Sequence, residues 1–124
     1  MVLGEVSLQT NDVVKLSEFY RKLLKIEIKE NSDKYRNEVH QFILTEGVGL
    51  TVYNNGKYKN NNNENICLAF TVDNVDEEYN RLLKIGVKII EPPKIQPWGA
   101  KNMHFIDPDG NHIYFRSIPK STTP

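Results

Sequence analysis

The heptapeptide YRKLLKI at residues 20–26 recurs 59 positions later as YNRLLKI at residues 79–85. A second pair follows in the same order, because QFILTEG at residues 41–47 matches HFIDPDG at residues 104–110, 63 positions later. Two amphipathic helices can share one such motif by chance, but the agreement of both segments in order argues against chance. One loop insertion explains the small change in offset. The sequence therefore predicts an internal duplication.

Within each copy, the sequence predicts a strand, a helix and three further strands. In the first copy, residues 5–10 alternate polar and apolar side chains as a half-buried strand does. Residues 13–24 carry apolar side chains at helical spacing, after the N-cap candidates Asn11 and Asp12. Ile26 and Ile28 predict a short strand. The last two strands, which form a hairpin, are predicted at residues 40–44 and 48–53.

The second copy repeats this order after an Asn-rich stretch, residues 54–65, which we expect to be a mobile linker because it has little apolar surface. Residues 91–99 contain three prolines, so we expect an extended loop there that carries Trp98. Gly86 is the expected end of the helix. The elements predicted are a strand at 66–72, a helix at 75–85, a strand at 87–90 and a hairpin of strands at 103–106 and 112–116.

The alternation along the strands predicts which side chains a helix covers and which line a cleft between the two half-sheets. The apolar members should pack under the helices: Val6, Leu8, Phe42, Leu50, Val52, Leu68, Phe70, Phe105, Ile113 and Phe115. The opposite members should point into the cleft: Glu5, Ser7, Gln9, Gln41, Thr51, Tyr53, Cys67, Ala69, His104, Tyr114 and Arg116.

Length and charge exclude several classes of protein. The chain has 124 residues, enough for one domain that folds without a disulfide or a metal, and its single cysteine excludes an internal disulfide framework. The formal net charge is zero, which offers no field for capturing nucleic acid or a membrane surface. Glu5 comes too early for a signal peptide. We therefore expect a cytoplasmic protein that binds a small molecule or another copy of itself.

The duplicated unit resembles the vicinal oxygen chelate superfamily, which includes glyoxalase I, extradiol dioxygenases, fosfomycin-resistance thiol transferases and bleomycin-resistance proteins. The resemblance rests on NDVVKLSEFYRKLL at residues 11–24 and WGAKNMHFIDPDGNHIYF at residues 98–115. PPKIQPWGAKN at residues 92–102 looks most like the bleomycin-resistance branch. The resemblance implies one α+β domain, residues 1–124, of two βαβββ modules (about 1–58 and 64–119) that form an incomplete barrel around a cleft. It also implies a homodimer.

Metal-dependent members of this superfamily place their ligands, usually His, Gln and Glu, at four positions that correspond here to Glu5, Thr51, Cys67 and Tyr114. The second could be off by one, at Leu50. A divalent site needs about three converging donors. Glu5 is one good ligand, and Cys67 could serve after losing its proton, but a tyrosine with a pKa near 10 is a poor one. His104 could rescue such a site. We expect no metal and no other cofactor.

The residues expected to bind a ligand are Glu5, Ser7, Thr51, Tyr53, Cys67, Trp98, His104, Tyr114 and Arg116, and no catalytic residue is assigned. Trp98 could stack on a planar ligand or close a hydrophobic edge. His104 could act as an acid or base, or form a neutral wall of the pocket. Cys67 could be a nucleophile, but a small strand residue is the favoured interpretation.

The function predicted from these residues and the resemblance is metal-free binding that sequesters an aromatic or amphipathic small molecule. One alternative is a metal-dependent, glyoxalase-like lyase or isomerase, or a thiol transferase. Another is an accessory module with a vestigial cleft that binds protein.

Overall fold

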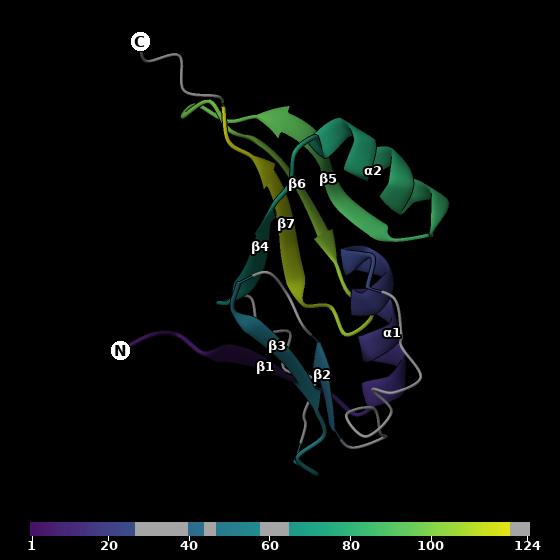
Figure 1. Ribbon diagram of the computed structural model, residues 1–124. Helices are drawn as coiled ribbons and strands as arrows, with labels where there is room; N and C mark the ends of the chain where they lie inside the picture. The colour runs from purple at the N-terminus through teal and green to yellow at the C-terminus, as the bar shows by residue number, and fades with distance from the viewer. Residues whose placement is uncertain (27–39, 44–46, 58–64, 120–124) are drawn as a thin grey trace. The chain divides into compact units, whose positions relative to one another are not determined.

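The computed structural model describes residues 1–26, 40–43, 47–57 and 65–119 (Figure 1). The chain divides into two compact units, Met1–Asn61 and Asn62–Pro124, each with one helix and one sheet. In the described residues, neither helix is long and apolar enough to cross a membrane. Most of the Asn-rich stretch, the predicted strand residue Ile28 and the turn at 44–46 lie outside the described residues.

The first unit contains α1 (Val13–Leu24) and a three-stranded sheet in the order β1-β3-β2. The first strand pairs in parallel with the third, and the second pairs with the third in antiparallel fashion. α1 packs against β2 and β3. The strands of this sheet are β1 (Glu5–Gln9), β2 (His40–Ile43) and β3 (Gly49–Tyr53).

The second unit contains α2 (Val75–Lys84) and a four-stranded sheet in the order β4-β7-β6-β5. β4 pairs in parallel with β7, and β6 lies antiparallel to both β7 and β5. This repeats the pairing of β1, β2 and β3, so the duplication predicted from sequence has a counterpart in the strand order. The strands are β4 (Cys67–Thr71), β5 (Lys88–Ile95), β6 (Lys101–Ile106) and β7 (His112–Ser117).

Both helices begin where their capping residues predict. The Asp12 carboxylate accepts a hydrogen bond from the Lys15 amide at 3.0 Å, and α1 covers the predicted range, 13–24. The Asn74 side chain caps α2 in the same way, at 3.1 Å from the Glu77 amide. α2 ends one residue earlier than predicted, and Gly86 follows with a φ of +82°.

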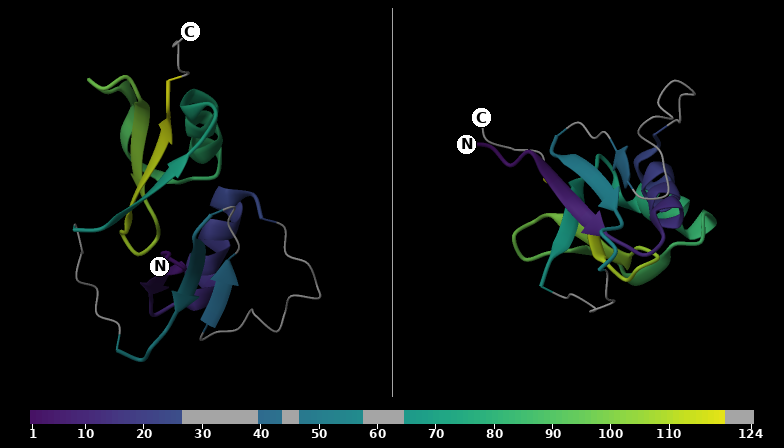
Figure 2. Two further views of the ribbon diagram at one scale, coloured as in Figure 1. Left: turned by 60° about the vertical axis from the view of Figure 1, so that its left-hand side comes forward. Right: turned by 90° about the horizontal axis from the view of Figure 1, so that it is seen from below.

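Each unit buries one face of its sheet under its helix. In the first unit, Leu50 and Val52 are buried beneath α1. In the second, α2 lies against one side of the sheet (Figure 2), where Phe105 and Phe115 meet edge-on with ring centroids 4.9 Å apart. The ring of Phe70 also meets that of Phe115 edge-on, with centroids 6.0 Å apart. Of the predicted core residues, Leu50, Val52, Phe105, Ile113 and Phe115 are buried, whereas Val6, Leu8, Leu68 and Phe70 on β1 and β4 are only half-buried. One strand of the first unit departs from the prediction.

That exception is Gln41, which we predicted in a cleft and which instead lies on the side of the sheet that faces α1. Gln41 is paired with the buried Val52 in the strand register, is itself only 3% exposed, and accepts a hydrogen bond from the Arg21 guanidinium of α1. A buried guanidinium needs an acceptor, and Gln41 supplies one. In the strand register, Phe42 is the partner of Thr51.

The proline-rich loop predicted at 91–99 is also wrong in part, because β5 continues through Pro92 and Pro93 to Ile95. β5 is an edge strand of the described sheet, with register shifts on both sides of Glu91. Prolines lack an N–H to donate, but an edge strand needs only one side of its ladder. The remaining turn, residues 96–100, carries Trp98.

Candidate functional site

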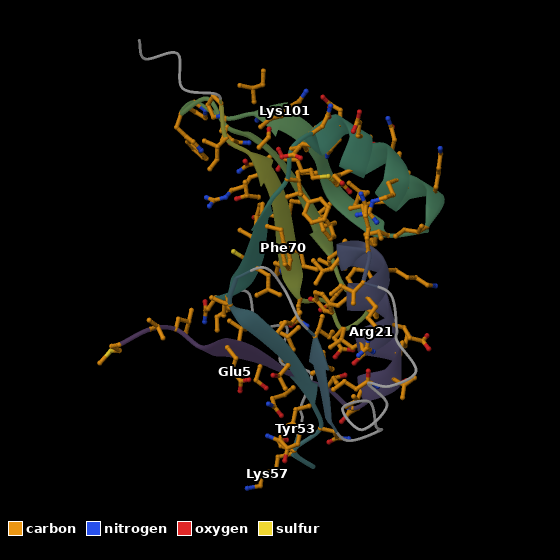
Figure 3. All side chains as sticks on the ribbon, viewed as in Figure 1. Glu5, Arg21, Tyr53, Lys57, Phe70 and Lys101 are labelled. Carbon is orange, nitrogen blue, oxygen red and sulfur yellow. The ribbon has the colours of Figure 1, made fainter. Side chains whose placement is uncertain are left out.

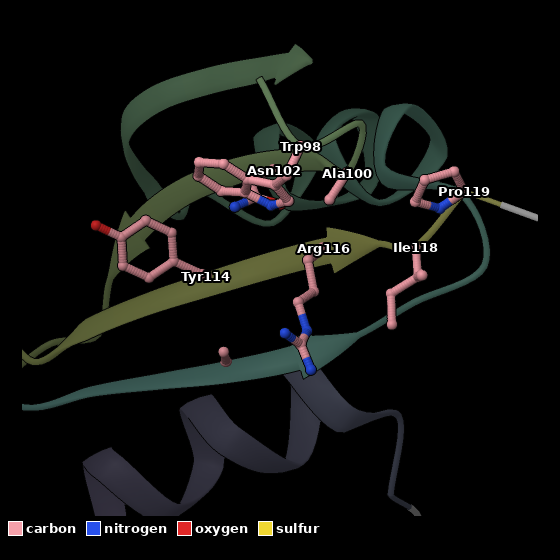
Figure 4. A pocket seen from close by; sticks show the side chains of 8 residues that line it. Trp98, Ala100, Asn102, Tyr114, Arg116, Ile118 and Pro119 are labelled. Carbon is pink, nitrogen blue, oxygen red and sulfur yellow. The ribbon is translucent and has the colours of Figure 1, made fainter. Parts of the chain in front are cut away.

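A pocket of about 470 Å³ lies on the second unit, on the face of its sheet opposite α2, which we call the open face. The second unit alone supplies every residue that lines it. Its volume falls in the range of pockets that hold small molecules. The lining residues, shown in Figure 4, are Ala69, Trp98, Ala100, Asn102, Tyr114, Arg116, Ile118 and Pro119.

Strand alternation brings the first group of lining residues together. Tyr114 and Arg116 are two residues apart on β7, while Ile113 and Phe115 point the other way and are buried. Ala69 of β4 is the register partner of Tyr114, and Asn102 of β6 is that of Arg116. The small side chain of Ala69 leaves open the space beside these larger neighbours.

Trp98 reaches the pocket from the turn between β5 and β6. The Gln96 amide donates to the Ala100 carbonyl at 2.8 Å, and the Gly99 amide donates to the Gln96 carbonyl at 2.9 Å. The indole is 70% exposed, although it is the largest side chain at the site. A wall of the pocket is therefore a large aromatic surface that faces water.

Tyr114 is held in place by a stacked neighbour. Its ring lies 4.4 Å from that of His104, its register partner on β6, with the two planes only 8° apart. His104 in turn shares a hydrogen bond with His112, with 2.8 Å between Nε2 of His104 and Nδ1 of His112. Stacking on His104 limits the rotation of the Tyr114 phenol.

The environment of His104 favours the neutral imidazole. Burial lowers its pKa below 6.5, the positive charge that His112 can carry lowers the pKa further, and the Glu91 carboxylate opposes both. Glu91 is the register partner of His104 on β5. One of the two rings donates the shared proton, so the pair loses its hydrogen bond when both rings are protonated.

Arg116 is the only charged residue that lines the pocket. Its Nε donates to the Thr71 hydroxyl at 3.2 Å, across the β4–β7 pair. Near it, Oδ1 of Asn102 is buried and has no hydrogen-bond partner among the described residues. The polar side-chain groups of the lining residues are thus a guanidinium, an amide, a phenol and the indole N–H of Trp98.

The predicted residues of the first unit lie on the face of its sheet opposite α1. The Thr51 hydroxyl donates to the Glu5 carboxylate at 2.9 Å, and Ser7 is the register partner of Thr51. The Ser7 hydroxyl accepts a hydrogen bond from the Gln9 amide group at 3.1 Å. Tyr53 is exposed at the end of β3, and Figure 3 marks it together with Glu5.

The predicted set is therefore brought together in two groups, one in each unit. Glu5, Ser7, Thr51 and Tyr53 share a face in the first unit. In the second unit, Trp98, Tyr114 and Arg116 line the pocket, His104 stacks behind Tyr114, and Cys67 lies exposed at the start of β4.

The hydrogen bond between His112 and His104 was not predicted from the sequence. The signal was available, because residues flanking a short hairpin turn become diagonal neighbours on one face. Ile118 and Pro119 follow the last predicted strand, and their part in the pocket had no local signal in the sequence. Ala100 and Asn102 were also missed as lining residues.

The four positions at which the resemblance implies metal ligands do not offer a fitting donor set here. Glu5 and Cys67 begin their strands, and Thr51 and Tyr114 occupy the third position of theirs, so the two units correspond. Leu50, the alternative to Thr51 for the second ligand position, is buried on the side of the sheet that faces α1, so Thr51 is the matching residue. The Glu5 carboxylate already accepts from Thr51, and hydroxyl and phenol groups are weak ligands. In the described parts of the chain, no three His, Cys, Asp or Glu side chains form a metal cluster.

Comparisons with solved structures show the same fold at low sequence identity. A glyoxalase/bleomycin resistance protein/dioxygenase from Nocardioides is 20% identical, with a TM-score of 0.77 over 100% of this chain and 87% of that one. A family enzyme of the same description from Burkholderia phytofirmans PsJN is 17% identical, with a TM-score of 0.76 over 94% and 98%. The fosfomycin resistance protein FosX from Listeria monocytogenes is 20% identical, with a TM-score of 0.72 over 97% and 95%.

These likenesses establish the α+β fold with βαβββ-type elements. No curated protein matches the sequence significantly. The model of one protein family matches residues 2–115, nearly the whole chain. The chain therefore belongs to the Glyoxalase/Bleomycin resistance protein/Dioxygenase superfamily.

Proposed function

We propose that this protein binds a flat aromatic small molecule in the pocket of the second unit and sequesters it without changing it. The observation that carries the proposal is the exposure of Trp98, 70% of whose surface faces water at the wall of a pocket of about 470 Å³. A ligand that stacks on Trp98 covers only one face of the indole, which is part of the roughly 150–250 Å² that such a side chain can bury. Removing about 60 Å² of it from water stabilises the complex by about 1.5 kcal/mol at about 25 cal/mol per Å².

The chemistry of the lining favours binding over catalysis. Among the lining residues there is no carboxylate, thiol or imidazole to act as nucleophile, acid or base. His104 lies behind Tyr114 and is engaged with His112. Sequestration needs affinity alone, and this is the mode of the bleomycin-resistance-like branch that residues 92–102 resemble.

The test uses Trp98 as its own reporter, because it is the only tryptophan in the chain. Titration with a panel of two-ring aromatic compounds should change its fluorescence, and a ligand at 100 times its Kd should add about 2.7 kcal/mol to the free energy of unfolding. Trp98→Ala should weaken binding about tenfold, a loss of about 1.4 kcal/mol, when measured by calorimetry. Its melting temperature should change little because the indole is exposed.

The matched control is Leu83→Ala, which removes a half-exposed apolar side chain from α2, away from the pocket. This variant should keep the affinity of the wild type. Failure of every aromatic compound to bind would overturn the proposal. Near-stoichiometric Ni, Zn, Mn or Fe in protein purified without chelators would instead favour a metal-dependent lyase, isomerase or transferase.

A further inference from the structure

We infer that the ligand of this pocket is an aromatic anion, with a carboxylate or similar group bound by Arg116. The inference rests on the proposed function and narrows it to one chemical class. It follows from the charges on the open face, from the way Arg116 is held, and from the placement of the aromatic walls.

The charges around the pocket are positive. Arg116 is the one charged lining residue, and Lys94 of β5 is the register partner of Asn102, another lining residue. The carboxylate of β5, Glu91, is paired instead with His104. Asp73 follows β4 but forms no ion pair with Arg116 in the described structure. An anionic ligand would therefore meet an unneutralised guanidinium.

The guanidinium is positioned while its terminal nitrogens stay available. Nε of Arg116 donates to the Thr71 hydroxyl at 3.2 Å, and within the described residues the two Nη groups make no hydrogen bond. Two parallel N–H groups on a planar fork match the two oxygens of a carboxylate. The bond to Thr71 reduces the side-chain entropy that binding would otherwise remove.

The aromatic walls lie beside this charge. Figure 4 shows Trp98, Tyr114 and Arg116 around one space, with the small side chain of Ala100 between Trp98 and Pro119. Tyr114 and Arg116 are two residues apart on β7, a separation of about 7 Å along a strand. A two-ring aromatic acid is long enough to place its ring at the aromatic side chains and its carboxylate at the guanidinium.

The experiment compares three probes of one shape: 2-naphthoate, 2-naphthalenemethanol and 2-naphthylmethylammonium. Calorimetry at low salt should show naphthoate binding at least tenfold more tightly than the alcohol, with the ammonium compound the weakest. Added NaCl should reduce this preference, because ions screen an exposed charge pair. Arg116→Gln should bind the acid and the alcohol equally.

Two variants separate charge from shape. Arg116→Lys keeps the charge but loses the planar fork, so it should retain part of the preference. Thr71→Val removes the partner of Nε and should weaken naphthoate binding a few-fold while leaving the alcohol unaffected. Lys84→Gln, which removes one positive charge from the exposed end of α2, is the control and should behave as the wild type.

The outcomes distinguish the inference from the proposed function. Equal binding of all three probes by the wild type would overturn the inference and leave aromatic binding intact. Tighter binding of the ammonium compound would do the same. Binding of none of them would overturn both. If Arg116→Gln does not fold, the salt dependence of the wild type and the affinities of Arg116→Lys still test the inference. A preference for naphthoate over the alcohol that changes neither with added salt nor in Arg116→Lys would contradict it.

Discussion

Three influences act on the pKa of the His104 imidazole. Burial is the largest, and it lowers the pKa of His104 from its usual 6.5, as does the neighbouring His112. Glu91 raises the pKa, but the lowering influences are stronger. Because Tyr114 stacks on this ring, the protonation of His104 is coupled to the wall of the proposed pocket.

We predict that acidification below about pH 6.5 destabilises the protein through His104. The unfolded chain binds a proton at the ordinary pKa, about 6.5, whereas the folded chain does so only at a lower pH. The free energy of unfolding therefore falls as the pH drops from about 6.5 to the lowered pKa, and this contribution is constant below it. Urea denaturation between about pH 5 and 8 measures the slope, which should be smaller in His104→Gln.

Two variants at neighbouring residues should shift the pKa of His104 in opposite directions and serve as controls. His112→Gln removes one lowering influence, so an NMR titration should place the pKa of His104 closer to 6.5. Glu91→Gln removes the raising influence and should move that pKa further down. The account would be wrong if neither variant changed the titration of His104.

The turn between β5 and β6 shows how an element sets the position of a site residue. Gly99 has a φ of +96°, which L side chains rarely adopt. A Cβ at this position would also lie 3.2 Å from the Cγ of Pro119, another lining residue. The turn that carries Trp98 to the pocket therefore has a backbone conformation, and a close approach to Pro119, that only glycine accepts without strain.

We predict that Gly99→Ala destabilises the protein by about 1–2 kcal/mol and also weakens binding of an aromatic ligand. The stability loss comes from the positive φ, and the affinity loss from displacement of Trp98 or Pro119. Urea denaturation and calorimetry with 2-naphthoate measure the two effects separately.

Gly86→Ala is the matched control for this prediction. Gly86 has a φ of +82°, but a Cβ there would meet no atom within 4 Å, and the residue is not part of the pocket. The control should lose a comparable amount of stability and keep its affinity. Equal affinity in both glycine variants would show that the turn does not position Trp98.

Elements whose determinants are local were predictable from the sequence. α1 was predicted to the residue because its apolar spacing and the Asp12 cap are contained in the segment itself. The extension of β5 was missed, since proline is tolerated there only because the strand lies at the edge of its sheet. Gln41 was misplaced for a similar reason, because its burial depends on the guanidinium of Arg21, 20 residues away.

The same division holds for the pocket. Strand alternation predicted that Tyr114 and Arg116 share one face of the sheet, and the prolines of residues 91–99 predicted a loop at Trp98. The bond between His104 and His112 depends on which residues face each other across the hairpin, and the contribution of Pro119 depends on where the chain runs after β7. Neither is encoded in a short segment.

At the scale of the whole molecule, the two units leave equivalent strands at the edges of their sheets. In the described residues, β1 pairs only with β3, and β4 pairs only with β7. The backbone groups along an open edge favour pairing with another strand or cover by another segment. The homodimer implied by the resemblance would be one way to cover these edges.

We predict that the protein is a homodimer in solution, with a mass by light scattering about twice the 14.4 kDa of the chain. Cys67 gives an independent test because it is the only cysteine, is exposed, and lies on the edge strand β4. A nitroxide attached to Cys67 can give a dipolar signal only between copies. The expected result is one defined distance that disappears when labelled protein is diluted with an excess of unlabelled protein. A mass of one chain at every concentration, with no dipolar signal, would mean that the edges are covered within the chain or by water.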